Sequence, residues 1–527
     1  MPSKVFILIL PIFFYTVAVQ GQADSLRIMI ESKYAVATGD ALPHWLAFNQ
    51  FGFFESGESN GYLRAEIKKG LFKTKDFEMT TEVDFLGRTA GDHFLLHEAY
   101  LNLEWKQFDL QIGLNEPRNS DFPDDLSMGH LVTSRNAPTI PKITAGFLEY
   151  VDVPLTKGFL QVKGVLAQGI LEEDRVVERA LYHEKWAYLR TQKLPINLYA
   201  GFANVALFGG ELNGVKQSNN YWDVFFGRRS STSNVNGDSV NAAGAHYGIF
   251  DYGAQIETDD ISINVYYQQP WEDGTSLKNF SAINKDYQIG IHLVLKGQQW
   301  VSEILYENLN SEHQSGEGLP DPYINGVGYN FDDLRAIENY DQFLEDELGI
   351  TTSGVTFEEF IDIIRFETNN NLEWGGRDSY YVNRGYPDGN THKRFTIGNS
   401  LFLTSDRVFE MTGFQALDAS RIVNNRIRAQ HFGVKGNIVP WDVDYRLLVT
   451  FTHNSGTYAG KYGGNINSWN LNREYFFRDG VNSDYLRLDL SKELEKTPMA
   501  LNLALAFDQR GFGQYFGFLV GAKYTWR

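Results

Sequence analysis

The sequence predicts an all-β fold, a transmembrane antiparallel β-barrel with short helices in its loops. Three observations predict it: recurring segments of apolar-polar alternation, an apolar N-terminal leader, and a C-terminal segment that ends in an aromatic residue. Alternation with a period of two is the pattern of a β-strand with two different faces. About ten residues suffice for a tilted strand to cross a bilayer.

The C-terminal segment shows the alternation most clearly. Phe518, Val520, Ala522, Tyr524 and Trp526 share one face of the expected strand. No strand edge can face lipid, so the last strand of a barrel pairs with the first. A soluble sandwich also alternates, but its strands lie closer together in the sequence and it seldom forms one unit of this length.

The same alternation recurs along the chain, at 63–67, 101–105, 108–115, 261–268, 443–452, 486–490 and 501–508. We count roughly sixteen to eighteen plausible strands, and the number in such a barrel is even. The polar faces carry charges of both signs, among them Arg64, Glu66, Asp444 and Arg446. We therefore expect a lumen laced with ion pairs and partly filled, not a wide open pore.

The N-terminus, residues 1–21, is typical of a secretory signal peptide. Lys4 precedes the apolar run from Val5 to Val19, and the small residues around Gly21 suit cleavage before Gln22. A retained helix is the less favoured alternative, because the run is short for a span and polar sequence follows it. The leader predicts export.

Composition agrees with a membrane barrel and excludes some partners. The 527 residues include no Cys, so we expect neither a lipoprotein nor disulfides. The formal net charge of -19 argues against nucleic acid as a partner. The mean hydropathy is -0.32, which suits a barrel because half of its strand residues face the lumen. Aromatic residues make up 14%, as girdles at the membrane interfaces require.

These patterns divide the chain after the leader into two parts. We expect an N-terminal periplasmic segment over 22–61, with a candidate short plug helix at 41–49. We expect the outer-membrane β-barrel over 62–527, interrupted by a partly helical loop insertion at about 310–390. Long connections in such barrels usually lie outside the cell, so the insertion is expected there.

Helical periodicity supports the insertion. Apolar residues form one stripe over 332–348, and a second helix is expected at 357–366, with Thr356 and Glu359 in a capping-box pattern ahead of it. A further short helix is expected in a loop at 175–185.

Motifs of catalysis are not evident. His183 stands beside Glu184, but the sequence has no HExxH pair, no GxSxG elbow and no phosphate-cradling glycine loop. We therefore expect no enzyme activity, no cofactor and no metal. Aromatic residues such as Tyr221 and Trp222 suit stacking on sugar rings, and equally suit girdle or loop packing.

A series of segments carries a family resemblance: 127–138, 181–186, 206–210, 375–381, 397–399, 425–436, 444–446 and 454–458. In this order they resemble the capsule assembly Wzi family of outer-membrane proteins. The resemblance spans most of the chain after the leader and implies a barrel of about 18 strands. It implies a surface lectin that attaches capsular polysaccharide without cofactor or catalysis. It also implies a helical bundle at the periplasmic mouth, where this chain offers only the one short helix.

Three hypotheses for function remain: a surface lectin for capsular or exopolysaccharide, a passive channel or porin, and an outer-membrane hydrolase. The first rests on the resemblance, the second on architecture, and the third lacks a local nucleophile motif. The expected partners are the polysaccharide, outer-membrane lipid and the barrel-assembly machinery. The loop residues expected to contact carbohydrate are Trp222, Trp374, Arg377, Tyr380, Tyr381 and Trp469.

Overall fold

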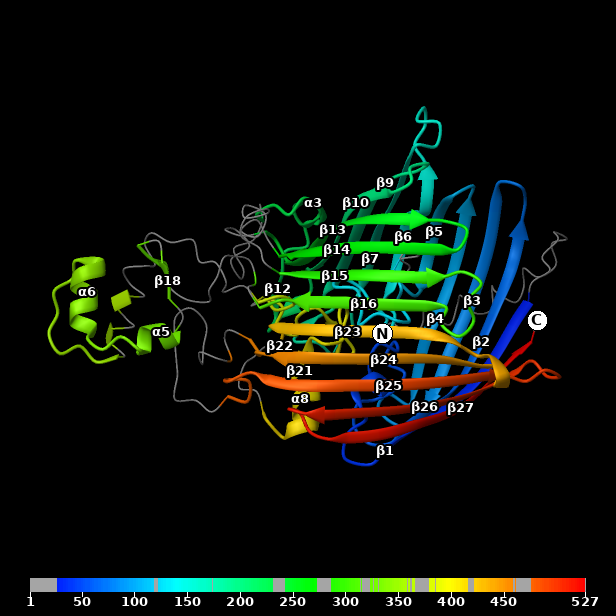
Figure 1. The fold of residues 1–527 in the computed structure, drawn as a ribbon. Coiled ribbons are helices and arrows are strands. Elements are labelled where there is room, and N and C mark those ends of the chain that lie inside the picture. The colour runs from blue at the N-terminus through cyan, green and yellow to red at the C-terminus, as the bar shows by residue number, and fades with distance from the viewer. Residues whose placement is uncertain are drawn as a thin grey trace.

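The computed structural model is a closed barrel of eighteen antiparallel strands (Figure 1). It describes residues 26–117, 122–172, 174–230, 242–272, 286–312, 314, 323–325, 327–329, 331–357, 359–360, 363–364, 379–383, 385–415, 421–457, 460 and 475–526. The expected fold class is confirmed.

The barrel strands are β1 (Leu26–Ala37), β2 (Asn60–Lys73), β3 (Phe77–Arg88), β4 (Phe94–Trp105), β5 (Phe108–Leu114), β6 (Pro141–Asp152), β7 (Leu160–Ile170), β9 (Leu181–Thr191), β10 (Asn197–Phe208), β13 (Ala245–Glu257), β14 (Ile261–Trp271), β15 (Tyr287–Leu295), β16 (Glu303–Asn310), β23 (Ile427–Ile438), β24 (Val443–Asn454), β25 (Val481–Glu493), β26 (Met499–Arg510) and β27 (Tyr515–Trp526).

Short elements occupy the connections. The helices are α2 (His44–Ala47), α3 (Tyr221–Phe225), α5 (Phe331–Arg335), α6 (Tyr340–Leu348), α8 (Ser405–Thr412) and the 3-10 turn η2 (Val439–Trp441). The short strands are β8 (Val177–Glu178), β11 (Glu211–Leu212), β12 (Val215–Lys216), β17 (Tyr323–Ile324), β18 (Val327–Gly328), β19 (Thr391–His392), β20 (Phe395–Thr396), β21 (Leu403–Thr404) and β22 (Ile422–Asn424).

The last strand closes the barrel, as the sequence predicts. β27 pairs antiparallel with β1, with Trp526 opposite Ile28 and Val520 opposite Tyr34. Val520 and Trp526 lie on the exposed outer face, whereas Leu519, one position away, is buried. The two-faced strand therefore has its apolar face toward the membrane.

The first strand corrects the expected domain boundary. β1 lies within 22–61, the segment expected to be periplasmic, and it pairs with both β2 and β27. The barrel therefore begins at Leu26, not at residue 62. The alternation in β1 is blurred because Met29 and Ala35 are apolar but face the lumen, where both are buried.

The two ends of the barrel differ in their connections. One end carries short turns, such as 74–76 between β2 and β3 and 439–442 between β23 and β24, and the other carries the long connections. Short turns are periplasmic and long loops are extracellular in such barrels. Four exposed tryptophans, Trp105, Trp300, Trp441 and Trp526, lie at the short-turn end and form an interfacial girdle there.

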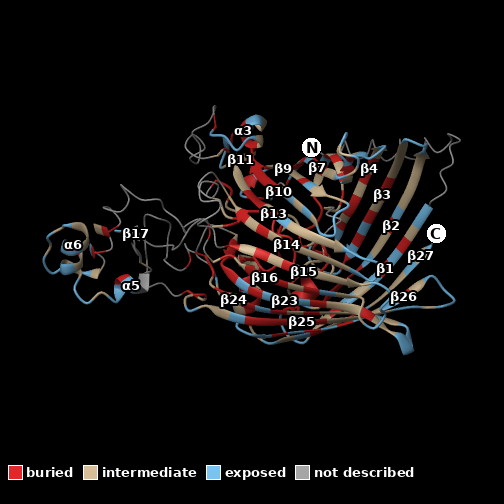
Figure 2. Cartoon of the chain, turned by 45° about the horizontal axis from the view of Figure 1, so that its top comes forward, coloured by how far each residue is buried: buried red, intermediate tan, exposed pale blue. Residues whose placement is uncertain are grey.

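Many lumen-facing side chains are charged and paired, as expected. Burial alternates along the strands (Figure 2). Arg64 lies 2.6 Å from Asp84 on the neighbouring strand, and Lys68 lies 2.8 Å from Glu82. Outward-facing Leu63 is 58% exposed in the absence of lipid. Ion pairs thus link neighbouring strands on the inner face of the barrel, whereas the outer face is apolar.

The helices in the described connections are short. None of them has both the length and the apolar character that a membrane-spanning helix needs. The helix expected over 332–348 is split into α5 and α6, and the capping box is present: the Thr356 amide donates to Glu359 Oε2 at 2.9 Å. The prediction of a helix at 175–185 is wrong, because β8 and the start of β9 occupy that segment.

Candidate functional site

Three long connections fold back into the outer half of the lumen. They are 38–59, 115–140 and 379–404, and their apolar side chains form one buried cluster inside the barrel. The Ser134 amide donates to the Ile397 carbonyl at 2.9 Å, and the Asn399 side chain donates to the Gly129 carbonyl at 2.9 Å. We call these segments the plug. They are tied to one another as well as to the wall.

Helix α2 lies in the plug, at the place of the expected plug helix. The His44 amide donates to Asp508 on β26 at 2.7 Å, and Trp45 Nε1 donates to Thr450 on β24 at 3.0 Å. Both side chains are fully buried. Because α2 lies between β1 and β2, it enters the lumen from the outer end, not from the periplasmic mouth.

The wall also holds the plug through buried carboxylates. Glu307 on β16 accepts a hydrogen bond from Ser127 Oγ at 2.7 Å and another from the Met128 amide at 2.8 Å. Gln288 on β15 donates to the same carboxylate at 2.9 Å. Removal of Glu307 would leave several buried donors unpaired, so its role is structural.

A second carboxylate joins two connections at the outer end. Glu172 accepts from the Lys393 amide at 2.8 Å, contacts the His392 ring and lies 3.4 Å from Arg175. Arg175 in turn donates to the Gly389 carbonyl at 3.0 Å. Burial raises the pKa of Glu172, but the His392 hydrogen bond and the two nearby cations outweigh burial and lower it to about 2.

One cluster of potential metal ligands occurs among the described residues. Donor atoms of Asp84, His97 and Glu98 lie within 4.8 Å of one another, and all three residues are buried. Arg64 already binds Asp84, and Glu116 lies 2.9 Å from His97 Nε2. These partners account for the cluster as part of the ion-pair network of the lumen.

The outer end exposes an aromatic patch on α3 and the residue after it. We define the α3 patch as Tyr221, Trp222, Phe225 and Phe226. Trp222 is 61% exposed and Phe226 is 54% exposed, and their rings stack with centroids 6.1 Å apart. The guanidinium of Arg228 lies 4.5 Å from the Phe226 ring centroid. The patch and the adjacent Arg228 thus combine flat apolar faces with hydrogen-bond donors.

The family assignment follows from comparison of the sequence. The family model described as capsule assembly protein Wzi matches residues 37–312, which is just over half of the chain. The chain belongs to the capsule assembly protein Wzi family. Curated protein sequences give no match to it. Family membership and the closed barrel together identify an integral protein of the cell outer membrane.

Among solved structures, one carbohydrate-binding barrel supports the fold, and further outer-membrane proteins match with lower TM-scores. Wzi of Escherichia coli, described as an outer-membrane protein in group 1 capsule assembly and a carbohydrate-binding β-barrel, matches with a TM-score of 0.50 and 10% identity over 94% of this chain and 83% of that chain. OpdL of Pseudomonas aeruginosa matches with a TM-score of 0.44 and 10% identity over 95% and 98%. OccAB4 of Acinetobacter baumannii matches with 0.42 and 9% over 96% and 99%.

The structure separates the six residues expected to bind carbohydrate. Trp222 is exposed in the α3 patch, but Tyr380 and Tyr381 are buried in the plug. Tyr380 donates to Asp286 at 2.8 Å, and Tyr381 donates to the Leu131 carbonyl. Neither ring offers a free face for stacking in this conformation. Trp374, Arg377 and Trp469 lie outside the described residues.

The aromatic neighbours of Trp222 complete the patch. Phe226 and Arg228 were not among the expected site residues, although the run from Tyr221 to Arg229 holds four aromatic and two basic residues in a loop. This local density of aromatic and basic residues is the sequence signal that could have identified them. The single turn of α3 brings these aromatic rings into contact as one surface. The side chain of Asn220 caps this turn and accepts a hydrogen bond from the Trp222 amide at 3.1 Å.

Proposed function

We propose that this protein attaches capsular or exopolysaccharide to the cell surface as a non-enzymatic lectin. Membership of the capsule assembly protein Wzi family carries the proposal. Two features support it: the plug occupies the lumen at the end where long connections lie, and the α3 patch is exposed at that same end. Like the Wzi structure from Escherichia coli, it would then be a carbohydrate-binding barrel.

The α3 patch is our candidate for part of the binding surface. Sugar rings stack on aromatic faces through their C–H groups, while amide and guanidinium groups donate to hydroxyls. Trp222 and Phe226 provide the faces, and Arg228 provides donors. Trp374, Arg377 and Trp469 stay candidates from the sequence. No role in carbohydrate contact is proposed for Tyr380 or Tyr381.

The test compares polysaccharide on the cell with polysaccharide in the medium. Deletion of the gene should move glycan from the cell to the medium with total synthesis unchanged, and the wild-type gene should restore the cell-bound fraction. The W222A/F226A double variant should restore less, and F409A is the matched control, because Phe409 is an exposed aromatic residue on α8. Unchanged partitioning after deletion would refute the anchoring role.

A passive channel is the less favoured alternative, because the plug fills part of the lumen. An open channel needs a continuous aqueous path, whereas the plug places a buried apolar cluster across the outer half of the barrel. Conductance measurements separate the two functions.

A further inference from the structure

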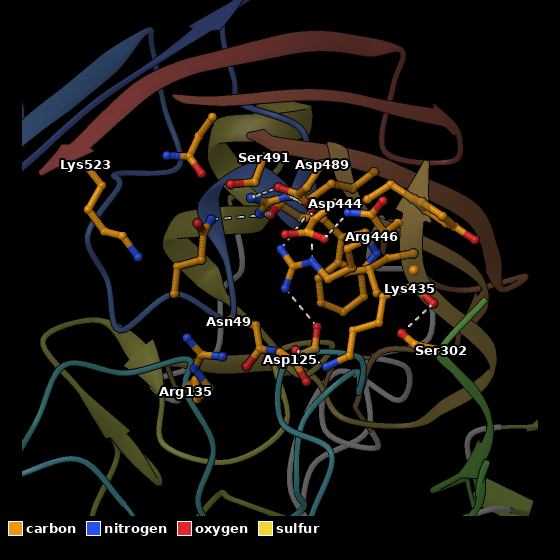
Figure 3. Close-up of a pocket in the computed structure, with 18 of the residues that line it drawn as sticks. Asn49, Asp125, Arg135, Ser302, Lys435, Asp444, Arg446, Asp489, Ser491 and Lys523 are labelled. Carbon is orange, nitrogen blue, oxygen red and sulfur yellow. Dashed lines mark hydrogen bonds and ion pairs between the residues drawn. The ribbon is translucent and has the colours of Figure 1, made fainter. Parts of the chain in front are cut away.

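A cavity of about 790 Å³ lies in the lumen beneath the plug (Figure 3). The plug forms its outer boundary through Asn49, Asp125 and Arg135. Residues near the short turns form its other end, among them Ser302 beside the β15–β16 turn and Asn437 beside the β23–β24 turn. The cavity therefore faces the periplasm. Its volume lies in the range of small-molecule sites.

A second cavity adjoins the first. It measures about 250 Å³ and shares Lys33, Gln50, Arg135 and Lys523 with the larger one. These four residues come from β1, β27 and two plug segments that are distant in sequence. They surround the place where the two cavities meet, so three cations and one amide face the same space.

Most other cations in the cavity already pair with carboxylates. Lys435 lies 2.9 Å from Asp125 and 2.8 Å from Glu303. Arg446 and Arg487 share Asp489, at 2.9 and 2.7 Å. Burial raises the pKa of Asp125, but the Lys435 hydrogen bond and charge outweigh it and hold the pKa below its usual range. Asp125 thus stays ionised opposite Lys435.

Arg135 and Lys523 differ from these cations. Within the described part of the chain, neither forms an ion pair with a carboxylate, whereas Lys33 lies 2.7 Å from Glu31. Arg135 instead stacks on Phe51, with its guanidinium carbon 5.3 Å from the ring centroid, which fixes its orientation. The Lys523 side chain points into the cavity (Figure 3). Carboxylates do lie near both cations: the charge of Arg135 acts on Glu116 and Asp125, and Lys523 lies opposite Glu31 in the pairing of β1 with β27. Glu31 and Asp125, however, are already held at 2.7 and 2.9 Å by lysines. Within the described residues Arg135 and Lys523 therefore have no direct carboxylate partner, and together they mark a place for an anion.

The rest of the lining suits hydroxyl groups. The lining includes Gln299 and Asn502, whose amides can donate and accept at once, as paired sugar hydroxyls require. The amide groups of Gln50 and Asn437 already donate to the Leu46 carbonyl and to Asp444, which leaves their oxygens as acceptors. A bare inorganic anion would leave these amides unused. The combination of a guanidinium, an ammonium and several amides therefore matches a ligand that has one anionic group and many hydroxyls.

We propose that this cavity binds an acidic saccharide, a pyranose that carries a carboxylate, from the periplasmic side. The fork of Arg135 binds the carboxylate and Lys523 adds a second charge, because guanidinium and carboxylate geometries match. The amides bind the hydroxyls. The site lies at the opposite end of the barrel from the α3 patch, so it stands or falls independently of the proposed surface attachment.

The test titrates the purified full-length protein with digalacturonate and with its neutral dimethyl ester by calorimetry. We expect the ester to bind at least about tenfold more weakly, because it lacks the charge that pairs with Arg135 and Lys523. Equal binding of the two sugars, or no binding of either, would overturn the proposal. So would displacement of the saccharide by an equal concentration of inorganic phosphate, which would indicate a simple anion site.

Variants locate the binding in this cavity. K523Q and the R135Q/K523Q double variant should weaken digalacturonate binding, the double variant by at least about tenfold. K75Q is the matched control, since Lys75 is an exposed cation in the β2–β3 turn at the same end of the barrel and does not line the cavity. K523Q alters only a partly exposed side chain, so it should fold. It therefore tests the site even if the double variant does not fold. Unchanged affinity in folded K523Q and in a folded double variant would refute the site.

Discussion

Single carboxylates join connections that the sequence separates widely, and the half-buried Glu172 is the clearest example. It lies just after β7, yet its partners His392 and Lys393 come from the connection between β16 and β23. Its lowered pKa of about 2 means that its ionised form is stabilised by these contacts. The ionised carboxylate therefore adds to the contacts that join the two connections, beside the hydrogen bonds from Arg175 to the Gly389 carbonyl and from the Val176 amide to Asp388.

We expect E172Q to loosen this contact. Loss of the charged hydrogen bonds should cost about 1–3 kcal/mol locally, seen as faster amide hydrogen exchange in 174–180 and 388–396. E178Q is the control, because Glu178 is exposed in the same connection. Equal exchange in wild type and E172Q would show that Glu172 does not join the two connections.

The same residue predicts a dependence on pH. The pKa of Glu172 lies below the ordinary value of 4.5, so its stabilisation is complete above about pH 4.5 and is lost as the pH falls toward 2. Between pH 4.5 and 2, amide hydrogen exchange in 174–180 and 388–396 should become faster in wild type, after correction for the intrinsic rate. The increase should be much smaller in E172Q. A rise of equal size in both proteins would contradict this assignment.

Residue identity in the candidate site was only partly predictable. Trp222 could be chosen because it sits in an aromatic run between polar residues, and it is exposed. Tyr380 and Tyr381 looked the same in sequence but are buried, because Asp286 and the Leu131 carbonyl accept their hydroxyls. Partners so distant in sequence leave no local signal.

At the scale of elements, β1 is the strand on which closure depends. It pairs with β2 on one side and with β27 on the other. Ile30 lies near its middle, opposite Ala65 and Tyr524, and its side chain is 49% exposed toward the membrane. A charge at this position would have to be placed in the hydrocarbon core of the bilayer.

We expect I30R to lower the free energy of unfolding in lipid vesicles by about 1–3 kcal/mol, because Ile30 lies between the Trp526 girdle and the bilayer midplane, where the cost of arginine is greatest. I30V, which keeps an apolar side chain, should cost only about 0.5–1.5 kcal/mol. Denaturant titration of the inserted protein measures both. If I30R proved as stable as I30V, Ile30 would not face lipid.

Elements with regular two-faced patterns were the predictable ones. β24, with Val443 to Phe451 alternating, and β27 follow the expected register. β1 was missed because Met29 and Ala35 put apolar residues on its lumen face. The helix expected over 332–348 is interrupted between α5 and α6, and α6 begins at its own Asn339 cap. Tertiary packing, not periodicity, decides such cases.

At the scale of the whole molecule, the ends of the barrel fix its orientation. Lys75 lies in a short turn, and Glu58 lies in the long connection that enters the plug from the other end. Both are exposed, and the chain has no natural cysteine to interfere. In intact cells, a maleimide too large to cross the outer membrane should label E58C and not K75C.

Permeabilisation of the outer membrane should make K75C as reactive as E58C. That control separates orientation from a difference in intrinsic reactivity. Labelling of K75C in intact cells would reverse the orientation, and with it the assignment of the α3 patch to the cell surface.

The plug itself could not be foreseen in detail from the sequence. Its contacts join residues hundreds of positions apart, such as the His44 amide with Asp508 and Arg407 with the Leu42 carbonyl at 2.8 Å. The charged inner faces predicted a partly filled lumen, but only the assembled barrel specifies which connections fill it. The distinction between lectin and channel therefore belongs to the whole molecule.

Conductance tests that distinction. Wild-type protein in a planar bilayer should show no large, steady conductance, because the plug packs against the wall. Replacement of residues 41–57 by a short glycine-serine linker should raise conductance, since it removes α2 and its buried neighbours. A short linker can join the strands because Ala35 and Asn60 are already paired across β1 and β2. Heat-dependent migration on gels would confirm that the variant still forms a barrel. Large conductance in wild type would favour the channel, and an unchanged variant would mean that the other plug segments alone close the lumen.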